Sequence, residues 1–241
     1  MKISERCRAY EQKFPFTPCE GDTKVETNTK GWSRHKQYSI PNSIRNESRM
    51  FWCFGVSREI RFELACRKYN KKAKILTFDP TPLSQQTVDS ANRGNYKIEH
   101  TPKAYDTESG KTLNFYAIDE SLKCYQLDKP EIFYNIIEVE TINLKSILDT
   151  HGPNVDVIKL DIEGRWYEML KEIQDLKLQP IIVLVECEMY IGNTDEAFAK
   201  LDSIVELYEQ AGYTVRTNRQ LRNNSNCVEL CFIKQGHGIE L

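Results

Sequence analysis

Apolar and polar residues form strand-like and helix-like patterns in turn from Phe51 onward. The run 51–54 is short and apolar and ends at Gly55. In the next segment, 62–69, apolar residues recur at i, i+3, i+4 and i+7, which is the spacing of one helical face. Residues 51–69 therefore predict a strand, a turn and a helix.

The same alternation continues along the rest of the chain. Short apolar runs bounded by Gly, Pro or acidic residues predict strands, and the periodic segments between them predict helices. We expect further strands at 74–78, 96–100, 155–160, 181–185, 213–216 and 228–233, an antiparallel insertion of 113–117 with 133–139, and helices over 142–148, after 164 and over 193–212. This order predicts an α/β fold with a doubly wound, mostly parallel sheet that ends in a hairpin-like pair.

Residues 1–50 lack this alternation. They contain several prolines and glycines and show little periodicity. Ligands in doubly wound sheets bind beyond the carboxyl ends of the strands. We interpret 1–50 as an extension packed on, or over, that edge, and 51–241 as the main domain.

Composition narrows the classes of function. A chain of 241 residues suits one large domain, and its 33 Lys and Arg against 35 Asp and Glu give a net charge of -2. This balance gives no reason to expect nucleic acid or an anionic membrane as a partner. No apolar run approaches the roughly 20 residues of a membrane span, and the first residues are too polar for a signal peptide, so we expect a cytoplasmic protein. The oligomeric state stays open.

The eight cysteines are expected to be structural. They are scattered along the chain, and none forms a C-x-x-C pair of the kind that zinc sites use. Cys53 and Cys187 lie inside apolar strand-like runs, where a free cysteine behaves as a small buried hydrophobe.

Asp79 ends the second strand, within the sequence FDPTP at 78–82. An acidic residue at that place, about twenty residues after a strand-ending glycine, accepts hydrogen bonds from the hydroxyls of a nucleoside ribose. The alternative is a simple Asp-Pro turn, since aspartate readily starts turns. The residues alone do not decide between the two roles.

Ionisable residues gather at the end of the strand 155–160. Lys159, Asp161 and Glu163 stand at i, i+2 and i+4, so they share one face of the strand and project from its end. Glu186 ends the most apolar run of the chain. Removing ionisable groups from water beside apolar strands is energetically costly unless they form ion pairs or take part in binding or catalysis. We therefore expect a functional site here. The alternatives are an acidic helix N-terminus and a salt bridge between Lys159 and Glu186.

Residues 155–164, VDVIKLDIEG, resemble the signature of the FkbM-type S-adenosylmethionine-dependent methyltransferases. Further matches extend the resemblance over about 51–233. They are the apolar strand that ends in Glu186, FGV at 54–56, RFE at 61–63 and FDPTP at 78–82. The resemblance implies a Rossmann-like class I methyltransferase fold of seven strands with a reversed C-terminal hairpin. It also implies that the chain binds S-adenosylmethionine and methylates an oxygen, often a sugar hydroxyl.

By position, the resemblance assigns roles to single residues. Asp79, with Pro80 beside it, would hold the ribose, and Asp161 would face the methionine part and the reaction centre. Glu163 and Glu186 would lie near the acceptor. The other cofactor-binding residues would be Phe54, Gly55, Val56 and Ser57 at the methionine and ribose end, and Lys103, Ala104 and Tyr105 near the adenine. Many relatives carry a multi-glycine loop where this chain has only Gly55.

A sugar hydroxyl is a poor nucleophile at neutral pH, so a methyltransferase needs a group that takes its proton. The candidate catalytic residues are Asp161, Glu163, Glu186, Lys159 and His35. A divalent ion held by Asp161 and Glu186 would lower the pKa of the hydroxyl, but two carboxylates alone do not favour a metal. Trp32, His35 and Tyr38 of the extension are candidates to close over the site.

Three functions remain open. The leading one is an O-methyltransferase that acts on a sugar or glycan. The second is a degenerate methyltransferase fold that binds a carbohydrate or protein partner without turnover. The third, a dinucleotide-dependent enzyme, is disfavoured because residues 54–59 lack the G-x-G-x-x-G pattern.

Overall fold

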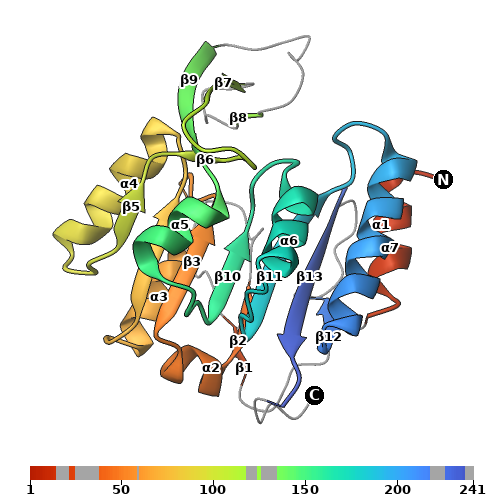
Figure 1. Cartoon of the computed structure of the whole chain (residues 1–241), viewed down its shortest axis with the longest axis horizontal. Helices are drawn as coiled ribbons and strands as arrows, with labels where there is room; N and C mark the ends of the chain where they lie inside the picture. The colour runs from red at the N-terminus through yellow and green to blue at the C-terminus, as the bar shows by residue number, and fades with distance from the viewer. Residues whose placement is uncertain are drawn as a thin grey trace.

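A sheet of seven strands forms the middle layer of the molecule (Figure 1). The computed structural model describes residues 1–14, 22–24, 38–58, 60–117, 124–125, 135–217 and 226–236. From one edge to the other the strands are β12 (Tyr213–Thr217), β13 (Cys227–Lys234), β11 (Ile182–Glu188), β10 (Val157–Leu160), β3 (Met50–Phe54), β4 (Lys74–Phe78) and β5 (Glu99–Thr101). Only β13 runs against its neighbours in this sheet. The predicted parallel sheet with a reversed C-terminal hairpin is confirmed.

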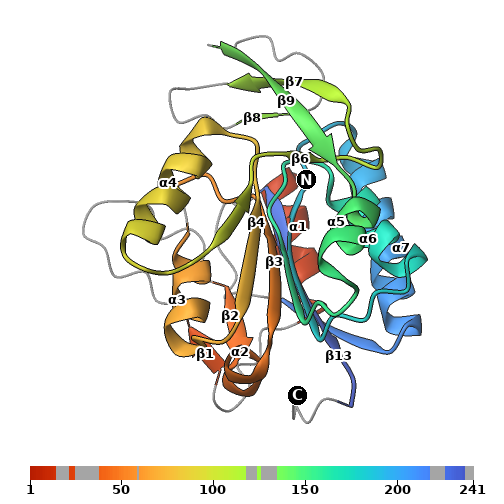
Figure 2. The same cartoon turned by 60° about the vertical axis from the view of Figure 1, so that its left-hand side comes forward.

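Helices cover both faces of this sheet, as Figure 2 shows from the side. One face carries α5 (Leu144–His151), α6 (Trp166–Asp175) and α7 (Thr194–Gln210), and the other carries α2 (Asn42–Glu47), α3 (Arg61–Tyr69) and α4 (Pro82–Arg93). Successive side chains of a strand point to opposite faces, so in β3 Trp52 packs under the first set of helices and Cys53 under the second. Both are fully buried. Among the described residues, no helix is both long and apolar enough to cross a bilayer.

The described parts of the N-terminal region pack in two places. Helix α1 (Ile3–Glu11) lies beside β13, where Glu11 Oε1 accepts the backbone N–H of Glu229 at 3.1 Å. The pairing of β13 with the short edge strand β12 ends at Leu230. Helix α1 therefore covers backbone groups of β13 that β12 does not reach. Strands β1 (Asp22–Lys24) and β2 (Ser39–Pro41) pair antiparallel, and Ile40 is buried on the face of α2 and α3. The domain boundary at residue 50 stays a prediction.

A second, small sheet stands above the carboxyl ends of the parallel strands (Figure 1). Its order is β6 (Ala104–Tyr105), β9 (Asn135–Ile142), β7 (Thr112–Ala117) and β8 (Cys124–Tyr125). The predicted antiparallel insertion is confirmed, because β7 pairs antiparallel with β9. Residues 133 and 134 of that prediction lie outside the described residues.

Several element ends differ from the sequence predictions. Strand β11 continues past Glu186 to Glu188, because β13 pairs with it as far as Cys227. Helix α5 begins after Asn143, whose side chain accepts the backbone N–H of Ser146, rather than at 142. The third strand is shorter than expected and spans 99–101. Helix α7 begins after Asn193, close to the predicted start, because the Asn193 side chain accepts two backbone N–H groups there.

Several cysteine and histidine side chains lie wholly or partly in the interior. Cys53 and Cys187 are fully buried, as predicted. His100 is half-buried, with Nδ1 3.0 Å from Thr77 Oγ1 and Nε2 3.3 Å from Ser84 Oγ. Burial lowers the pKa of His100, against the attraction of Asp79. His151 is also half-buried, and His237 lies outside the described residues.

We expect Gly55→Ala to lower the free energy of unfolding by about 3 kcal/mol or more. Gly55 has a φ of +75°, and an added Cβ would lie 1.7 Å from the carbonyl oxygen of Asp161, so the ends of β3 and β10 would have to separate. Gly110→Ala is the matched control, because Gly110 has a φ of +79° with nothing within 4 Å of an added Cβ. It should cost only the roughly 1–2 kcal/mol of the left-handed backbone. Urea denaturation measures both, and equal losses would contradict the close approach.

Candidate functional site

The loop after β3 is held in place by Asp79 at the end of β4. One carboxylate oxygen of Asp79 accepts the backbone N–H groups of Val56 and Ser57, at 2.7 and 2.8 Å. Ser57 has a φ of +47°, which a non-glycine residue rarely adopts. The N–H of Gly55 also donates to the carbonyl of Phe78 at 3.0 Å. The turn after β3 therefore takes its shape from β4.

The second oxygen of Asp79 is engaged as well. It accepts the backbone N–H of Thr81 at 2.8 Å and the Thr81 hydroxyl at 2.6 Å. A carboxylate offers about four lone-pair positions, and these four donors use them. Asp79 is 5% exposed. The structure thus shows the turn-forming role of Asp79, and a ribose would have to compete with these donors for its oxygens. The ribose role stays a prediction.

Lys159 lies beneath this loop and is buried with its counter-charge. Its Nζ donates to Glu63 Oε1 of α3 and to the carbonyl of Gly55, both at 3.1 Å. The side chains of Lys159 and Glu63 are 2% and 0% exposed. Burial opposes the charged form of Lys159, but the attraction of Glu63 and Asp161 outweighs it and raises the Lys159 pKa. These contacts give Lys159 a positioning role toward Gly55, and its predicted part in catalysis remains untested.

Three carboxylates meet at the carboxyl ends of β10 and β11. Ligand atoms of Asp161, Glu186 and Glu188 all lie within 4.8 Å of one another. Glu188 is 2% exposed, and its Oε2 accepts the N–H of Gly164 at 2.9 Å. Burial raises the Glu188 pKa well above its usual range, and repulsion from Glu163, Glu186 and Asp161 adds to this. The predicted association of Asp161 with Glu186 is therefore present, and Glu188 joins it.

Glu163 and Tyr38 border this carboxylate cluster of Asp161, Glu186 and Glu188. The Tyr190 hydroxyl donates to Glu163 Oε2 at 3.1 Å, and the Tyr38 hydroxyl lies 3.5 Å from Asp161 Oδ2. Glu163 has a φ of +40°, which brings its side chain out of the line of the strand. Tyr190 is 39% exposed. An aromatic ring thus stands at the border of the carboxylates.

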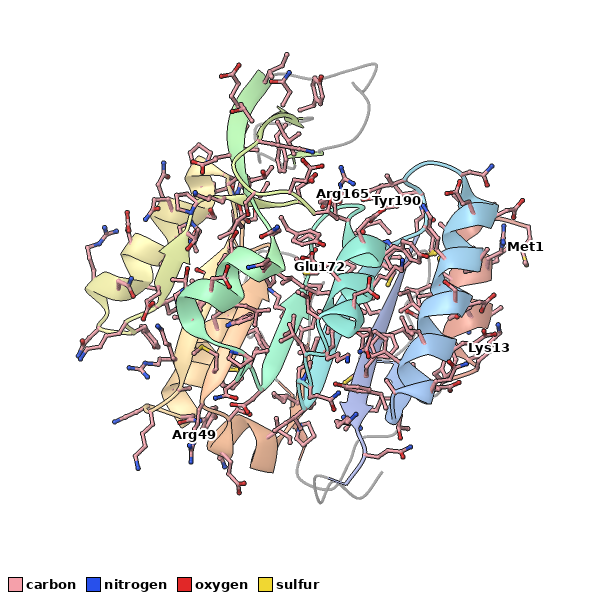
Figure 3. All side chains as sticks on the ribbon, in the orientation of Figure 1. Met1, Lys13, Arg49, Arg165, Glu172 and Tyr190 are labelled. Carbon is pink, nitrogen blue, oxygen red and sulfur yellow. The ribbon has the colours of Figure 1, made fainter. Side chains whose placement is uncertain are left out.

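Figure 3 labels Arg165 and Tyr190 in the upper part of the molecule, below the small sheet. Arg165 Nη2 is 3.3 Å from Asp106 Oδ2, which follows β6 directly. This ion pair connects the start of α6 to the insertion. The rim therefore carries a cation, an acid and an aromatic ring.

The residues predicted near the adenine are tied to other elements. Ala104 and Tyr105 are buried, and the Tyr105 hydroxyl donates to Glu172 Oε2 of α6 at 2.6 Å. The Tyr105 ring stands edge-on to Phe54, whose ring stacks on Phe78 with centroids 4.6 Å apart. Lys103 bonds Glu140 of β9 at the surface. Pro80 is half-buried between Asp79 and Thr81. Their contact with a cofactor stays a prediction.

Sequence reasoning missed Glu188, Glu63 and Tyr190. Glu186 and Glu188 stand two residues apart in ECE, so strand alternation would have placed both on one face had the strand been extended. Glu63 lies in a helix 96 residues away from Lys159 in sequence, and no local pattern joins them. His35 and Trp32 lie outside the described residues.

Comparison with solved structures finds distant similarities, and the three named below have TM-scores under 0.5. The pre-rRNA processing protein fibrillarin of Methanococcus jannaschii is 13% identical, with a TM-score of 0.49, and 89% of each chain is covered. The methyltransferase PaMTH1 of Podospora anserina, bound to SAH, is 12% identical with a TM-score of 0.42, covering 80% of this chain and 75% of that one. A putative caffeoyl-CoA O-methyltransferase of Staphylococcus aureus is 10% identical with a TM-score of 0.41, covering 97% and 93%.

Among curated proteins, none is significantly similar to this chain in sequence. A family model does match, that of the methyltransferase FkbM domain, over residues 52–215. The match contains β4, β10, β11 and most of β3, the strands whose ends carry Gly55, Asp79 and the carboxylate cluster. It covers more than half of the chain. The chain belongs to the FkbM methyltransferase family.

Proposed function

We propose that this protein is an S-adenosylmethionine-dependent O-methyltransferase whose acceptor is a hydroxyl of a sugar or glycan. Membership of the FkbM family supports methyl transfer in general. The observation that carries the choice of a hydroxyl is the carboxylate cluster of Asp161, Glu186 and Glu188, next to the loop of Gly55. A hydroxyl acceptor needs a group to take its proton, and carboxylates in a protected place perform this task.

The residue types at the strand ends fit the cofactor. S-adenosylmethionine carries a positive sulfonium and an ammonium group, and the acidic side chains at the ends of β10 and β11 attract positive charge. Gly55 leaves room for a close approach at the end of β3. Asp79 meets the ribose hydroxyls only if they replace the N–H groups of Val56 and Ser57 as its donors.

When bound, S-adenosylmethionine supplies a methyl group that is already activated by its positive sulfur. The protein must then align the acceptor hydroxyl, exclude water and hold the released proton. We assign the proton to the carboxylate of Asp161, which stands at the end of β10 and is half-buried. The exposed ring of Tyr190 offers a flat apolar surface to a sugar ring.

One observation supports a second candidate, a module that binds a partner without turnover. All four acceptor positions of Asp79 are used by the protein itself, which leaves the ribose to compete for them. In a protein that no longer binds the cofactor, these four donors could occupy the Asp79 carboxylate without competing with a ribose. Cofactor titration separates the two candidates.

We expect isothermal titration to show micromolar binding of S-adenosylmethionine and S-adenosylhomocysteine and none of NAD. With a panel of sugars and labelled methyl donor, Asp161→Asn should lower turnover about 100-fold or more, because general-base contributions are of that size. Its cofactor affinity should change less than about threefold. Asp149→Asn is the control, because Asp149 is an exposed acid of α5 that pairs with Lys145.

Two results would contradict the proposal. Failure to bind either sulfur ligand would favour the binding module. An equal fall of affinity and turnover in Asp161→Asn would place Asp161 in the cofactor site instead of at the acceptor.

We expect Asp79→Asn to weaken the binding of S-adenosylmethionine and S-adenosylhomocysteine alike, by about 10- to 100-fold, equivalent to the loss of about 1–3 kcal/mol. The amide would bring an N–H toward donors that now bond a carboxylate, which loosens the loop of Val56 and Ser57. Asp89→Asn, a change on the exposed side of α4, is the control. Unchanged affinity in Asp79→Asn would remove Asp79 from the cofactor site.

We expect Lys159→Met to lower the free energy of unfolding by about 3–5 kcal/mol, because it leaves Glu63 buried without its counter-charge. The double change Lys159→Met with Glu63→Leu removes both charges and should recover most of that loss. Its affinity for S-adenosylmethionine should still be reduced, since the Gly55 carbonyl has lost its donor. Urea denaturation and titration measure the two effects. Full affinity in the stable double variant would show that Lys159 does not position the loop.

A further inference from the structure

The geometry points to a divalent-cation site: we propose that Asp161, Glu186 and Glu188 bind one Mg²⁺ or Mn²⁺ ion at the carboxyl ends of β10 and β11. Their ligand atoms lie within 4.8 Å of one another. Oxygens around an octahedral ion of this size are about 3 Å apart when adjacent and about 4.2 Å apart when opposite. Small side-chain rotations therefore bring the three carboxylates onto one ion.

Glu188 supplies an observation independent of the clustering. It is 2% exposed, and its Oε2 is held by the N–H of Gly164 at 2.9 Å. Its Oε1 is buried and has no hydrogen-bond partner in the part of the chain that the structure describes. A carboxylate oxygen kept from water without a donor is costly, and the Glu188 carboxylate lies in a cluster with two others. A cation between the three groups satisfies this oxygen and removes the repulsion.

The buried cation of β10 is committed elsewhere. Lys159 stands two residues before Asp161 on β10, but its Nζ donates to Glu63 and to the carbonyl of Gly55. The ligands are all carboxylates, which suit hard ions such as Mg²⁺ and Mn²⁺, and they include neither the thiolate nor the imidazole typical of zinc.

This site has a consequence that rests on the proposed function. An ion held by Asp161 lies where the acceptor hydroxyl is expected, and coordination to a divalent ion lowers the pKa of a hydroxyl. The ion would then help to release the proton, which would pass to the oxygen of Asp161 that does not coordinate the ion. Binding of the ion itself does not depend on methyl transfer and is measured without the cofactor.

The test is a Mn²⁺ titration of the full chain followed by the electron paramagnetic resonance signal of free Mn²⁺, in the absence of S-adenosylmethionine. We expect one Mn²⁺ per chain, displaced by excess Mg²⁺. Glu188→Gln and Glu186→Gln should each raise the dissociation constant about tenfold or more, because each removes a charged ligand. Asp149→Asn, which changes an exposed acid of α5, should leave it unchanged.

Thermal unfolding shows whether a variant has lost the ion or the fold. Glu188→Gln removes a buried negative charge from a group of like charges, so without metal it should melt at or above the temperature of the wild type. Added Mn²⁺ should raise the melting temperature of the wild type and not that of Glu188→Gln. Loss of Mn²⁺ binding in a variant of unimpaired stability supports the site.

Absence of stoichiometric Mn²⁺ binding by the wild type overturns the proposal, and so does equal affinity of the wild type and Glu188→Gln. The carboxylates of Asp161, Glu186 and Glu188 would then share a proton in place of a metal ion. Titration with S-adenosylmethionine in the presence of a chelator is made in parallel. Cofactor binding without Mn²⁺ binding rejects the metal site and leaves the proposed methyltransferase function standing. Mn²⁺ binding without cofactor binding supports the metal site and contradicts the proposed methyltransferase function.

Discussion

The ion pair of Lys159 and Glu63 is the contact on which the loops at the carboxyl ends of β3 and β10 depend. Its ammonium group reaches the carbonyl of Gly55, so one buried charge ties α3, β10 and the turn after β3 together. Removing one partner of such a pair costs about 3–5 kcal/mol, far more than a surface salt bridge. Because Gly55 also touches the backbone of Asp161, the same contact sets the distance between the two loops that form the site.

This arrangement also explains how several acids are tolerated at one end of the sheet. Asp161 lies close enough to Lys159 to help raise its pKa, so the buried cation offsets part of the acidic charge. Glu188 gains a backbone donor from Gly164, whose φ of +89° directs its N–H toward the strand end. Glu188 is buried beside the other acids, and its burial first and their repulsion second raise its pKa. Strain and like charge thus gather where a ligand is expected.

Much of the fold was predictable because it follows from local patterns. The strand 74–78 has the predicted bounds, and the insertion and the reversed hairpin were anticipated from alternation and from turn residues. The site was predictable only along single strands, as with Asp161 after β10 and Glu186 in β11. The pairing of Lys159 with Glu63 and the donors of Asp79 join residues 96 and 22–23 positions apart, and no periodicity in the sequence encodes such contacts.

The loop after β3 has only one glycine, Gly55, and Asp79 fixes its shape instead. A glycine-rich loop presents backbone N–H groups because it bends freely, but it is also entropically costly to order. Here Val56 and Ser57 present their N–H groups in a fixed turn because the Asp79 carboxylate holds them. The cost is that this carboxylate is not open to a ribose until those N–H groups turn away. A ribose that binds Asp79, as predicted, would have to compete with these donors, so we expect its binding to be coupled to a change in the loop.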